Sequence, residues 1–288
     1  QTAYLFDRKE ARNLPLLIQF TVIGHFIYSK YRNIPKKNLE KLSIISYIYT
    51  KINHSQKMEG YMCRINPKVD LVFKKLFGSE ENKGILKAFI NSVLPDKEQI
   101  KDLTIKNPYN LPDYINGKLS ILDIKAEDEN GKLYDIEMQV AEQGYYGQRA
   151  LYYWGKTYTG QIDSGEMYSK LCKTIMISVL DFDYFKEDKR YHRTIRAKDV
   201  ETNSEYEELD YFELHFLELK KFDKDIKHIT TALERWTMFL NKAYEFDKNN
   251  IPEELANDPA VREAIEKLDI MYLDKKEREL YEAEQKAI

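Results

Sequence analysis

Residues 121–139, which read ILDIKAEDENGKLYDIEMQ, constrain the fold more strongly than any other stretch of the chain. Two segments in which apolar and polar residues alternate flank Asn130 and Gly131, and this arrangement predicts a β-hairpin. The dipeptide alone does not fix the number of residues in the turn, and that number decides which side chains face each other.

The pattern on the two faces of the hairpin selects the length of the turn. A two-residue turn would place Ile124 opposite Glu137, so that apolar side chains would meet polar ones along both strands. A three-residue turn over 129–131 places Ile124 opposite Ile136 and gives one coherent apolar face. We therefore predict the longer turn, with Gly131 in the left-handed region.

The longer turn has a consequence for the polar face of the hairpin. It sets Asp123 directly opposite Glu137, places Gln139 two residues farther along the same face, and pairs Lys125 with Asp135. Two facing carboxylates repel each other, and a divalent cation between them would turn that repulsion into ligation. The residues alone leave two interpretations open, a solvated polar face or a magnesium site.

Hydrophobic periodicity over the rest of the chain predicts an α/β fold in which helices flank a mixed sheet. The near-continuous apolar run over 172–182 is typical of a central strand that is covered on both faces. Residues from about 225 onward are highly charged and predict helices. The other expected elements are helices over 66–78, 80–94 and 144–162 and strands over 100–108, 119–127, 132–140, 189–199 and 210–219.

Residues 1–61 differ in charge from the remainder, at +6 against −9 within a net charge of −3. We predict a boundary near residues 58–62, with an N-terminal extension that is either a separate small helical region or a non-native leader. The apolar run over 14–28 contains Pro15 and His25 and is shorter than the ~20 residues of a membrane span, so we expect no membrane partner.

Other motifs limit the chemistry that the chain can carry. The two cysteines, Cys63 and Cys172, have no partner at metal-ligand spacing, and unpaired thiols suit a reducing compartment. The sequence contains neither the HExxH zinc motif nor a Walker phosphate loop. The acidic balance gives no electrostatic support for nucleic-acid binding, which would need a basic groove made by folding.

The spacing Asp-x13-Glu-x-Gln, set within a helix, three strands, a helix and a strand, resembles the PD-(D/E)XK nuclease superfamily. More closely, it is similar to the bacterial family of recombination-promoting nucleases (Rpn) and related transposases. The resemblance implies a restriction-endonuclease-like αβββαβ core with a mixed central sheet over 62–222 and a helical C-terminal region over 223–288. The stretches that carry it are 66–78, 121–139, 149–162, 177–185 and 212–222.

The resemblance also implies a set of metal ligands. Asp123 and Glu137 correspond to the metal-binding carboxylates, with the backbone carbonyl of Met138 as a third ligand. Asp70 corresponds to the acidic residue of the first helix, where it would be an outer or second-metal ligand. Gln139 stands where much of the superfamily has lysine, and an amide can orient a water molecule or a phosphate but cannot act as a base. The expected cofactor is Mg²⁺, with Mn²⁺ or Ca²⁺ as substitutes.

The helix that follows the hairpin supplies the expected DNA contacts. Arg149 and Tyr153 are four residues apart and share a helix face, and with Lys156 they are the predicted DNA-binding residues. Lys125 is either an auxiliary cation that supplies the charge that Gln139 lacks, or only the partner of Asp135. The aromatic residues predicted to pack in the core are Tyr152, Trp154 and Tyr158.

The resemblance implies a metal-dependent DNA endonuclease of the bacterial cytoplasm that hydrolyses phosphodiester bonds in recombination or mobile DNA. Its partners would be DNA and further copies of the chain, in a homodimer or a higher oligomer. The alternative is a catalytically weak nuclease-fold module that binds DNA or protein and acts through oligomerising C-terminal helices.

Overall fold

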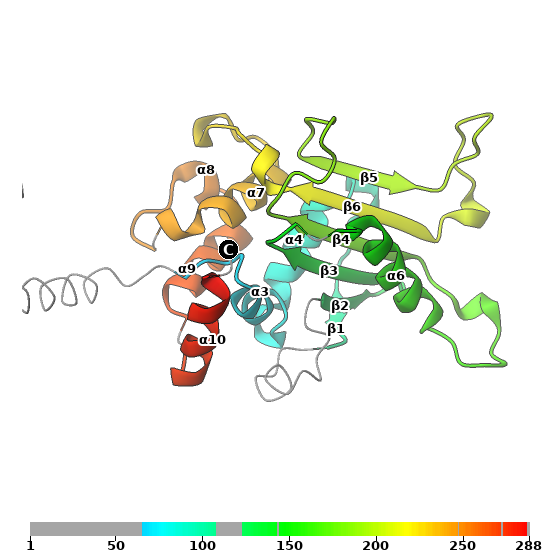
Figure 1. The fold of residues 1–288 in the computed structure, drawn as a ribbon, viewed down its shortest axis with the longest axis horizontal. Helices are drawn as coiled ribbons and strands as arrows, with labels where there is room; N and C mark the ends of the chain where they lie inside the picture. The colour runs from blue at the N-terminus through cyan, green and yellow to red at the C-terminus, as the bar shows by residue number, and fades with distance from the viewer. Residues whose placement is uncertain (1–64, 108–122, 143, 247, 272, 287–288) are drawn as a thin grey trace, which may run out of the picture. The chain divides into compact units, whose positions relative to one another are not determined.

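The structure of the chain, a computed structural model, describes residues 65–107, 123–142, 144–246, 248–271 and 273–286 (Figure 1). The predictions for residues 1–61 lie outside these ranges. The chain from residue 65 onward belongs to one compact unit. Among the described helices, none combines the length and the apolar character that crossing a membrane requires.

A six-stranded mixed sheet forms the centre of this unit, in the order β1-β2-β3-β4-β6-β5. The first three strands form an antiparallel meander, β4 and β6 continue the sheet in parallel with β3, and β5 closes the edge antiparallel to β6. The strands are β1 (Leu103–Ile105), β2 (Asp123–Asp128), β3 (Leu133–Gln139), β4 (Thr174–Leu180), β5 (His192–Arg196) and β6 (Phe212–Glu218).

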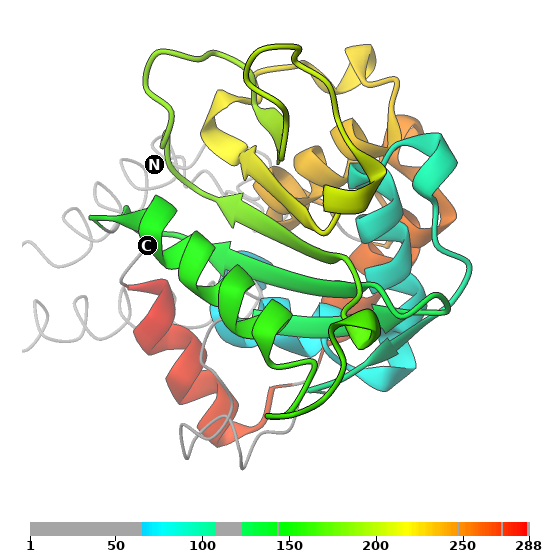
Figure 2. The same ribbon diagram turned by 90° about the vertical axis from the view of Figure 1, so that its right-hand side faces the viewer.

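Helices cover both faces of the sheet (Figures 1 and 2). Among the described helices, α6 lies on one face, whereas α3 and α4 lie on the other and the C-terminal helices pack against them. The α-helices within the described ranges are α3 (Asp70–Phe77), α4 (Lys83–Val93), α6 (Tyr146–Thr159), α7 (Ala232–Lys242), α8 (Glu253–Ala256), α9 (Pro259–Asp269) and α10 (Lys275–Gln285). The predicted αβββαβ order and the helical C-terminal region are therefore confirmed.

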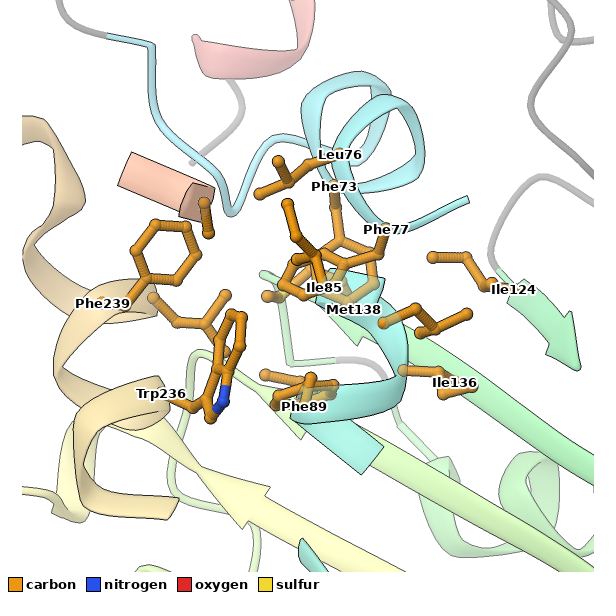
Figure 3. Close-up of a cluster of buried hydrophobic side chains, with 14 of the residues drawn as sticks. Phe73, Leu76, Phe77, Ile85, Phe89, Ile124, Ile136, Met138, Trp236 and Phe239 are labelled. Carbon is orange, nitrogen blue, oxygen red and sulfur yellow. The ribbon is translucent and has the colours of Figure 1, made fainter. Parts of the chain in front are cut away.

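The main core lies between the sheet and the helices α3, α4 and α7 (Figure 3). Phe77 on α3 packs against Phe89 on α4 and Trp236 on α7, with ring centroids 5.3 and 5.7 Å apart. Ile136 and Met138 of β3 are buried against this aromatic cluster. Because side chains alternate along a strand, burying these two residues directs the polar residues of β3 to the opposite face.

The hairpin has the predicted register. Asp123 pairs with Glu137 and Ile124 pairs with Ile136. Gly131 has a φ of 81°, in the left-handed region, and its amide donates to the carbonyl of Asp128 at 3.1 Å. The three-residue turn is therefore confirmed, since one residue fewer would have turned polar side chains toward the core.

The C-terminal helices bury their apolar faces within the same chain. On α9, Val261, Ala264 and Ile265 are at most 2% exposed. On α10, the Glu277 carboxylate lies 2.8 Å from Lys75 Nζ, and the Tyr281 hydroxyl accepts a hydrogen bond from the Asn66 amide at 3.1 Å. These contacts fix α10 against α3, and oligomerisation through the C-terminal helices stays a prediction.

Candidate active site

Two carboxylate positions face each other where β2 begins and β3 ends. The amide of Asp128 donates to the carbonyl of Lys132 at 3.0 Å, and hydrogen-bonded pairs alternate with non-bonded pairs along an antiparallel ladder. Asp123 and Glu137 therefore form a non-hydrogen-bonded pair, the kind in which Cα atoms are about 4.5 Å apart. The predicted juxtaposition is confirmed for the backbone.

The Glu137 side chain is 1% exposed and points toward α6, which supplies two hydrogen-bond donors. Arg149 Nη2 lies 2.5 Å from Glu137 Oε1, and the Tyr146 hydroxyl donates to Oε2 at 3.0 Å. Tyr146 and Arg149 are three residues apart, so they lie on one face of the helix. The site thus combines a buried carboxylate with one cation and one hydroxyl.

The surroundings fix the protonation of both donors. Burial raises the pKa of Tyr146 well above its usual value, and the negative charge of Glu137 adds to the rise, so the hydroxyl keeps its proton. Burial lowers the pKa of Arg149, but the hydrogen bond and charge of Glu137 outweigh this effect and the net shift is upward. Arg149 therefore stays protonated, and in this structure its charge balances a carboxylate that would be unstable if buried alone.

Gln139 adds a buried oxygen to the same face. Its side chain is 5% exposed, and in the described part of the chain its Oε1 accepts no hydrogen bond. Burying an oxygen without a partner costs about 1–3 kcal/mol, so such an atom points to a ligand.

The backbone carbonyl of Met138 is the third predicted ligand of the cation. The Gln139 carbonyl accepts from the Asp181 amide at 2.9 Å on the β4 side, and successive carbonyls of a strand alternate in direction. The Met138 carbonyl therefore points to the β2 side, where Asp123 is paired. Among the described residues no cluster of three or more Asp, Glu, His or Cys side chains forms, but carboxylate, carbonyl and amide oxygens are ligands that fit Mg²⁺.

Residues 67–288 match the family model described as PD-(D/E)XK nuclease family transposase. The chain belongs to this family. No curated protein and no solved structure matches it. The mixed sheet and its helices are those of a restriction-endonuclease-like fold, and the match continues through α10, so the C-terminal helices belong to the family's own architecture.

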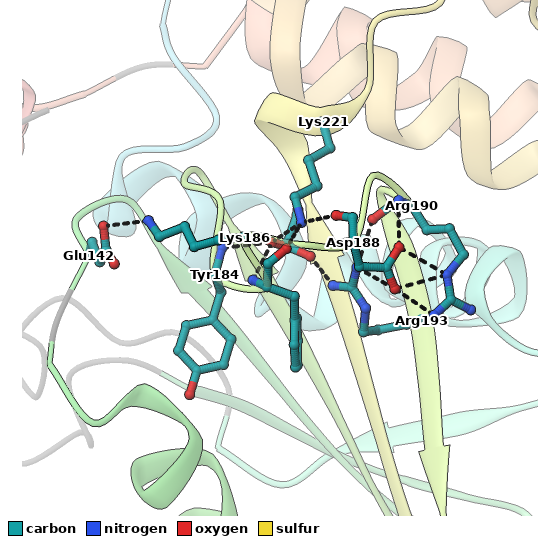
Figure 4. Close-up of polar contacts among 9 residues, drawn as sticks. Glu142, Tyr184, Lys186, Asp188, Arg190, Arg193 and Lys221 are labelled. Carbon is teal, nitrogen blue, oxygen red and sulfur yellow. Dashed lines mark hydrogen bonds and ion pairs between the residues drawn. The ribbon is translucent and has the colours of Figure 1, made fainter.

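Ion pairs and hydrogen bonds surround the loop after β4 of this PD-(D/E)XK protein (Figure 4), and the loop also contacts α6. The Glu218 carboxylate is fully buried at the end of β6, where it accepts from the amides of Tyr184 and Phe185 at 2.6 and 3.0 Å and pairs with Arg193. The Tyr184 hydroxyl in turn accepts from the Gly147 amide in the first turn of α6 at 2.8 Å. The hydrogen bonds of this loop therefore connect the end of β6 to the helix that carries Tyr146 and Arg149.

The remaining predicted residues of this nuclease-family protein lie in different parts of the fold. Lys125 Nζ lies 4.0 Å from the Asp135 carboxylate, so the pairing that the hairpin predicted is confirmed, and an auxiliary role of Lys125 stays a prediction. Asp70 lies on α3, on the other face of the sheet, with its carboxylate 3.2 Å from Lys74 Nζ. Its role as an outer ligand also stays a prediction.

The predicted DNA contacts on α6 are spread along the helix. Tyr153 is half-buried, with its ring 5.4 Å from the Arg149 guanidinium, whereas Lys156 is exposed. Tyr152 is 65% exposed, so its assignment to the core is wrong, because only one side of α6 faces the sheet. Trp154 does pack inward and stacks on Tyr158 at 5.1 Å.

Three residues at this site were not identified from the sequence. Tyr146 donates to Glu137, the buried Ser178 of β4 pairs in register with Glu137, and the Thr157 hydroxyl donates to Asp135 at 2.8 Å. Tyr146 and Thr157 recur with Arg149 at the spacing of one helix face, and this periodicity is a signal that could have identified both. Ser178 gives no such signal, because it lies in a uniformly buried strand.

Proposed function

We propose that this chain is a metal-dependent DNA endonuclease of the recombination-promoting nuclease type, which hydrolyses phosphodiester bonds in recombination or in mobile DNA. The observation that supports it best is the buried Gln139 Oε1, which has no hydrogen-bond partner in the described part of the chain and lies two residues beyond Glu137 on β3. Family membership supports the same reaction class.

Asp123, Glu137 and the Met138 carbonyl are the residues that would hold the cation, with Mg²⁺ as the preferred ion and Mn²⁺ or Ca²⁺ as substitutes. When bound, such a cation supplies Lewis-acid stabilisation of charge on the phosphate and lowers the pKa of water. Gln139 would orient a water molecule or a phosphate oxygen through its amide, which can neither take a proton nor carry charge. Tyr146 keeps the Glu137 carboxylate in one orientation.

A second candidate is a nuclease-fold module that binds DNA or protein without cutting it. It is favoured by one observation, that both oxygens of Glu137 already have partners, Arg149 and Tyr146. A carboxylate satisfied in this way needs no cation to be stable in the fold.

A plasmid-nicking assay separates these two functions. Wild type, Asp123→Ala and Glu137→Ala are incubated with supercoiled plasmid in Mg²⁺, Mn²⁺ or EDTA, and DNA binding is measured in parallel by gel shift. We expect metal-dependent nicking by wild type only, with a loss of about 100-fold or more in each variant. Glu127→Ala is the matched control, because Glu127 lies on β2 and pairs with the exposed Lys106.

Equal nicking by all the proteins, or none by wild type with either metal, would contradict the endonuclease. Binding without nicking would support the second candidate.

A further inference from the structure

The Arg149 guanidinium and the proposed cation would both bind the Glu137 carboxylate. In the structure Arg149 Nη2 lies 2.5 Å from Oε1, and the proposed cation would be held by the same group. A guanidinium and a divalent ion that share one buried carboxylate would repel each other strongly, since few water molecules screen them there. Full ligation of the cation therefore requires the guanidinium to move.

Tyr146 and Arg149, the α6 residues that bind Glu137, differ in their exposure to solvent. Tyr146 is fully buried, and its ring packs against Phe182, Tyr184 and Phe216. The Arg149 side chain is 18% exposed, so part of it already reaches solvent, although its Nε is buried. Its long stem can carry the charge outward while it stays in contact with the helix.

The exposed side of α6 suits a phosphate backbone as the new partner of Arg149. The helix sequence, YGQRALYYWGKTYT, contains Arg149 and Lys156 and no Asp or Glu, in a chain with 48 acidic residues. A nucleic-acid strand that runs along this helix meets no carboxylate from it. Guanidinium groups bind phosphate through paired hydrogen bonds, which makes phosphate a strong competitor for Arg149.

We propose that Arg149 competes with the metal ion for the Glu137 carboxylate. Without DNA its guanidinium holds Glu137, and when DNA binds it moves to a phosphate and frees the carboxylate for the cation. The inference rests on the proposed function in one respect, that the cation binds at Glu137. Because coupling between two ligands is reciprocal, DNA tightens metal binding and metal tightens DNA binding through this one side chain.

Direct measurement of Mn²⁺ binding by electron paramagnetic resonance tests the proposal without any activity readout. The full chain is titrated with Mn²⁺ alone and with a short phosphorothioate duplex, which keeps the phosphate charge and resists hydrolysis. For wild type we expect the duplex to lower the Mn²⁺ Kd by about tenfold. For Arg149→Gln we expect tight Mn²⁺ binding without DNA and a change of less than about twofold when the duplex is added.

Two further variants serve as controls. Arg262→Gln removes an exposed arginine of α9 that pairs with Glu266, and it should keep the wild-type coupling. Arg149→Lys retains a cation that can exchange between Glu137 and phosphate, and it should keep part of the coupling.

Arg149→Gln leaves a buried carboxylate without its countercharge, so its stability is measured as well. We expect Mn²⁺ to raise its melting temperature more than that of wild type, because the ion supplies the missing charge.

The outcomes separate the inference from the proposed function. The metal site is supported if Glu137→Ala abolishes Mn²⁺ binding. In that case, the competition is wrong if Arg149→Gln binds Mn²⁺ no more tightly than wild type, or if it keeps the full coupling to DNA. If no protein binds Mn²⁺ in a manner that depends on Glu137, the proposed function and the inference both fail.

Discussion

The hydroxyl of Tyr146 donates a hydrogen bond of 3.0 Å to Glu137 Oε2 and joins the first turn of α6 to the end of β3. These two residues are nine apart in sequence, yet one lies on a helix and the other in the centre of the sheet. The orientation of the carboxylate at the site therefore depends on how α6 packs against β3 and β4.

Replacing Tyr146 by Phe removes this donor and leaves Glu137 Oε2 with one hydrogen bond fewer in a buried place. We expect a loss of about 1–3 kcal/mol in the free energy of unfolding, measured by urea denaturation. Plasmid nicking should fall by about tenfold because the carboxylate loses its fixed orientation. A variant as stable and active as wild type would show that the hydroxyl does not position Glu137.

Gln139→Met replaces a buried amide by an apolar side chain of similar volume. Because Oε1 accepts no hydrogen bond in the described part of the chain, we expect stability in EDTA to rise by about 1 kcal/mol while nicking is lost. The matched control is Gln161→Met, since the Gln161 amide exchanges hydrogen bonds of 3.0 and 2.8 Å with the backbone of Cys172. The control should be destabilised, and a destabilised Gln139→Met would refute the ligand role.

Gly131→Ala tests the turn that sets the register of the site. Gly131 has a φ of 81°, and an added Cβ would lie 3.1 Å from Cys172 Sγ. The left-handed backbone alone should cost about 1–2 kcal/mol in stability, and the contact should add to this loss. Gly165→Ala is the control, because Gly165 has a φ of 91° with no atom within 4 Å of an added Cβ. Equal losses in the two variants would show that the Cys172 side chain moves away from the added Cβ at no cost in stability.

The histidine pair at the sheet edge predicts a dependence of stability on pH. His192 on β5 stacks on His215 of β6 with centroids 5.3 Å apart. Burial lowers the pKa of His192 from 6.5 to about 4, and the charges of His215 and Arg193 add to the shift. The unfolded chain therefore binds more protons between these two values, so the free energy of unfolding should fall by about 2–3 kcal/mol as pH drops from about 6.5 to about 4.

Urea denaturation at several pH values measures this dependence. His192→Gln should remove most of it, whereas His228→Gln, at an exposed position, should leave it unchanged. The same slope in wild type and His192→Gln would assign the effect to other groups.

Local patterns in the sequence determined the order of the elements and the register of the hairpin. The alternation of apolar residues about Asn130 and Gly131 allowed only the turn that pairs Ile124 with Ile136, and Asp123 then had to meet Glu137. The pairing of Lys125 with Asp135 followed from the same register. These predictions succeeded because strand periodicity is a property of the backbone itself.

The tertiary structure alone decided which groups satisfy Glu137 and which tyrosines of α6 are buried. Tyr146 and Tyr152 lie in the same helix, but Tyr146 is fully buried and Tyr152 is 65% exposed. Aromatic residues occur on every side of this helix, so its pattern does not identify the face that meets the sheet. That face, and with it the contact between Arg149 and Glu137, is set by the packing of α6 on the sheet and against the loop after β4, and hydrophobic periodicity within one helix does not encode such contacts.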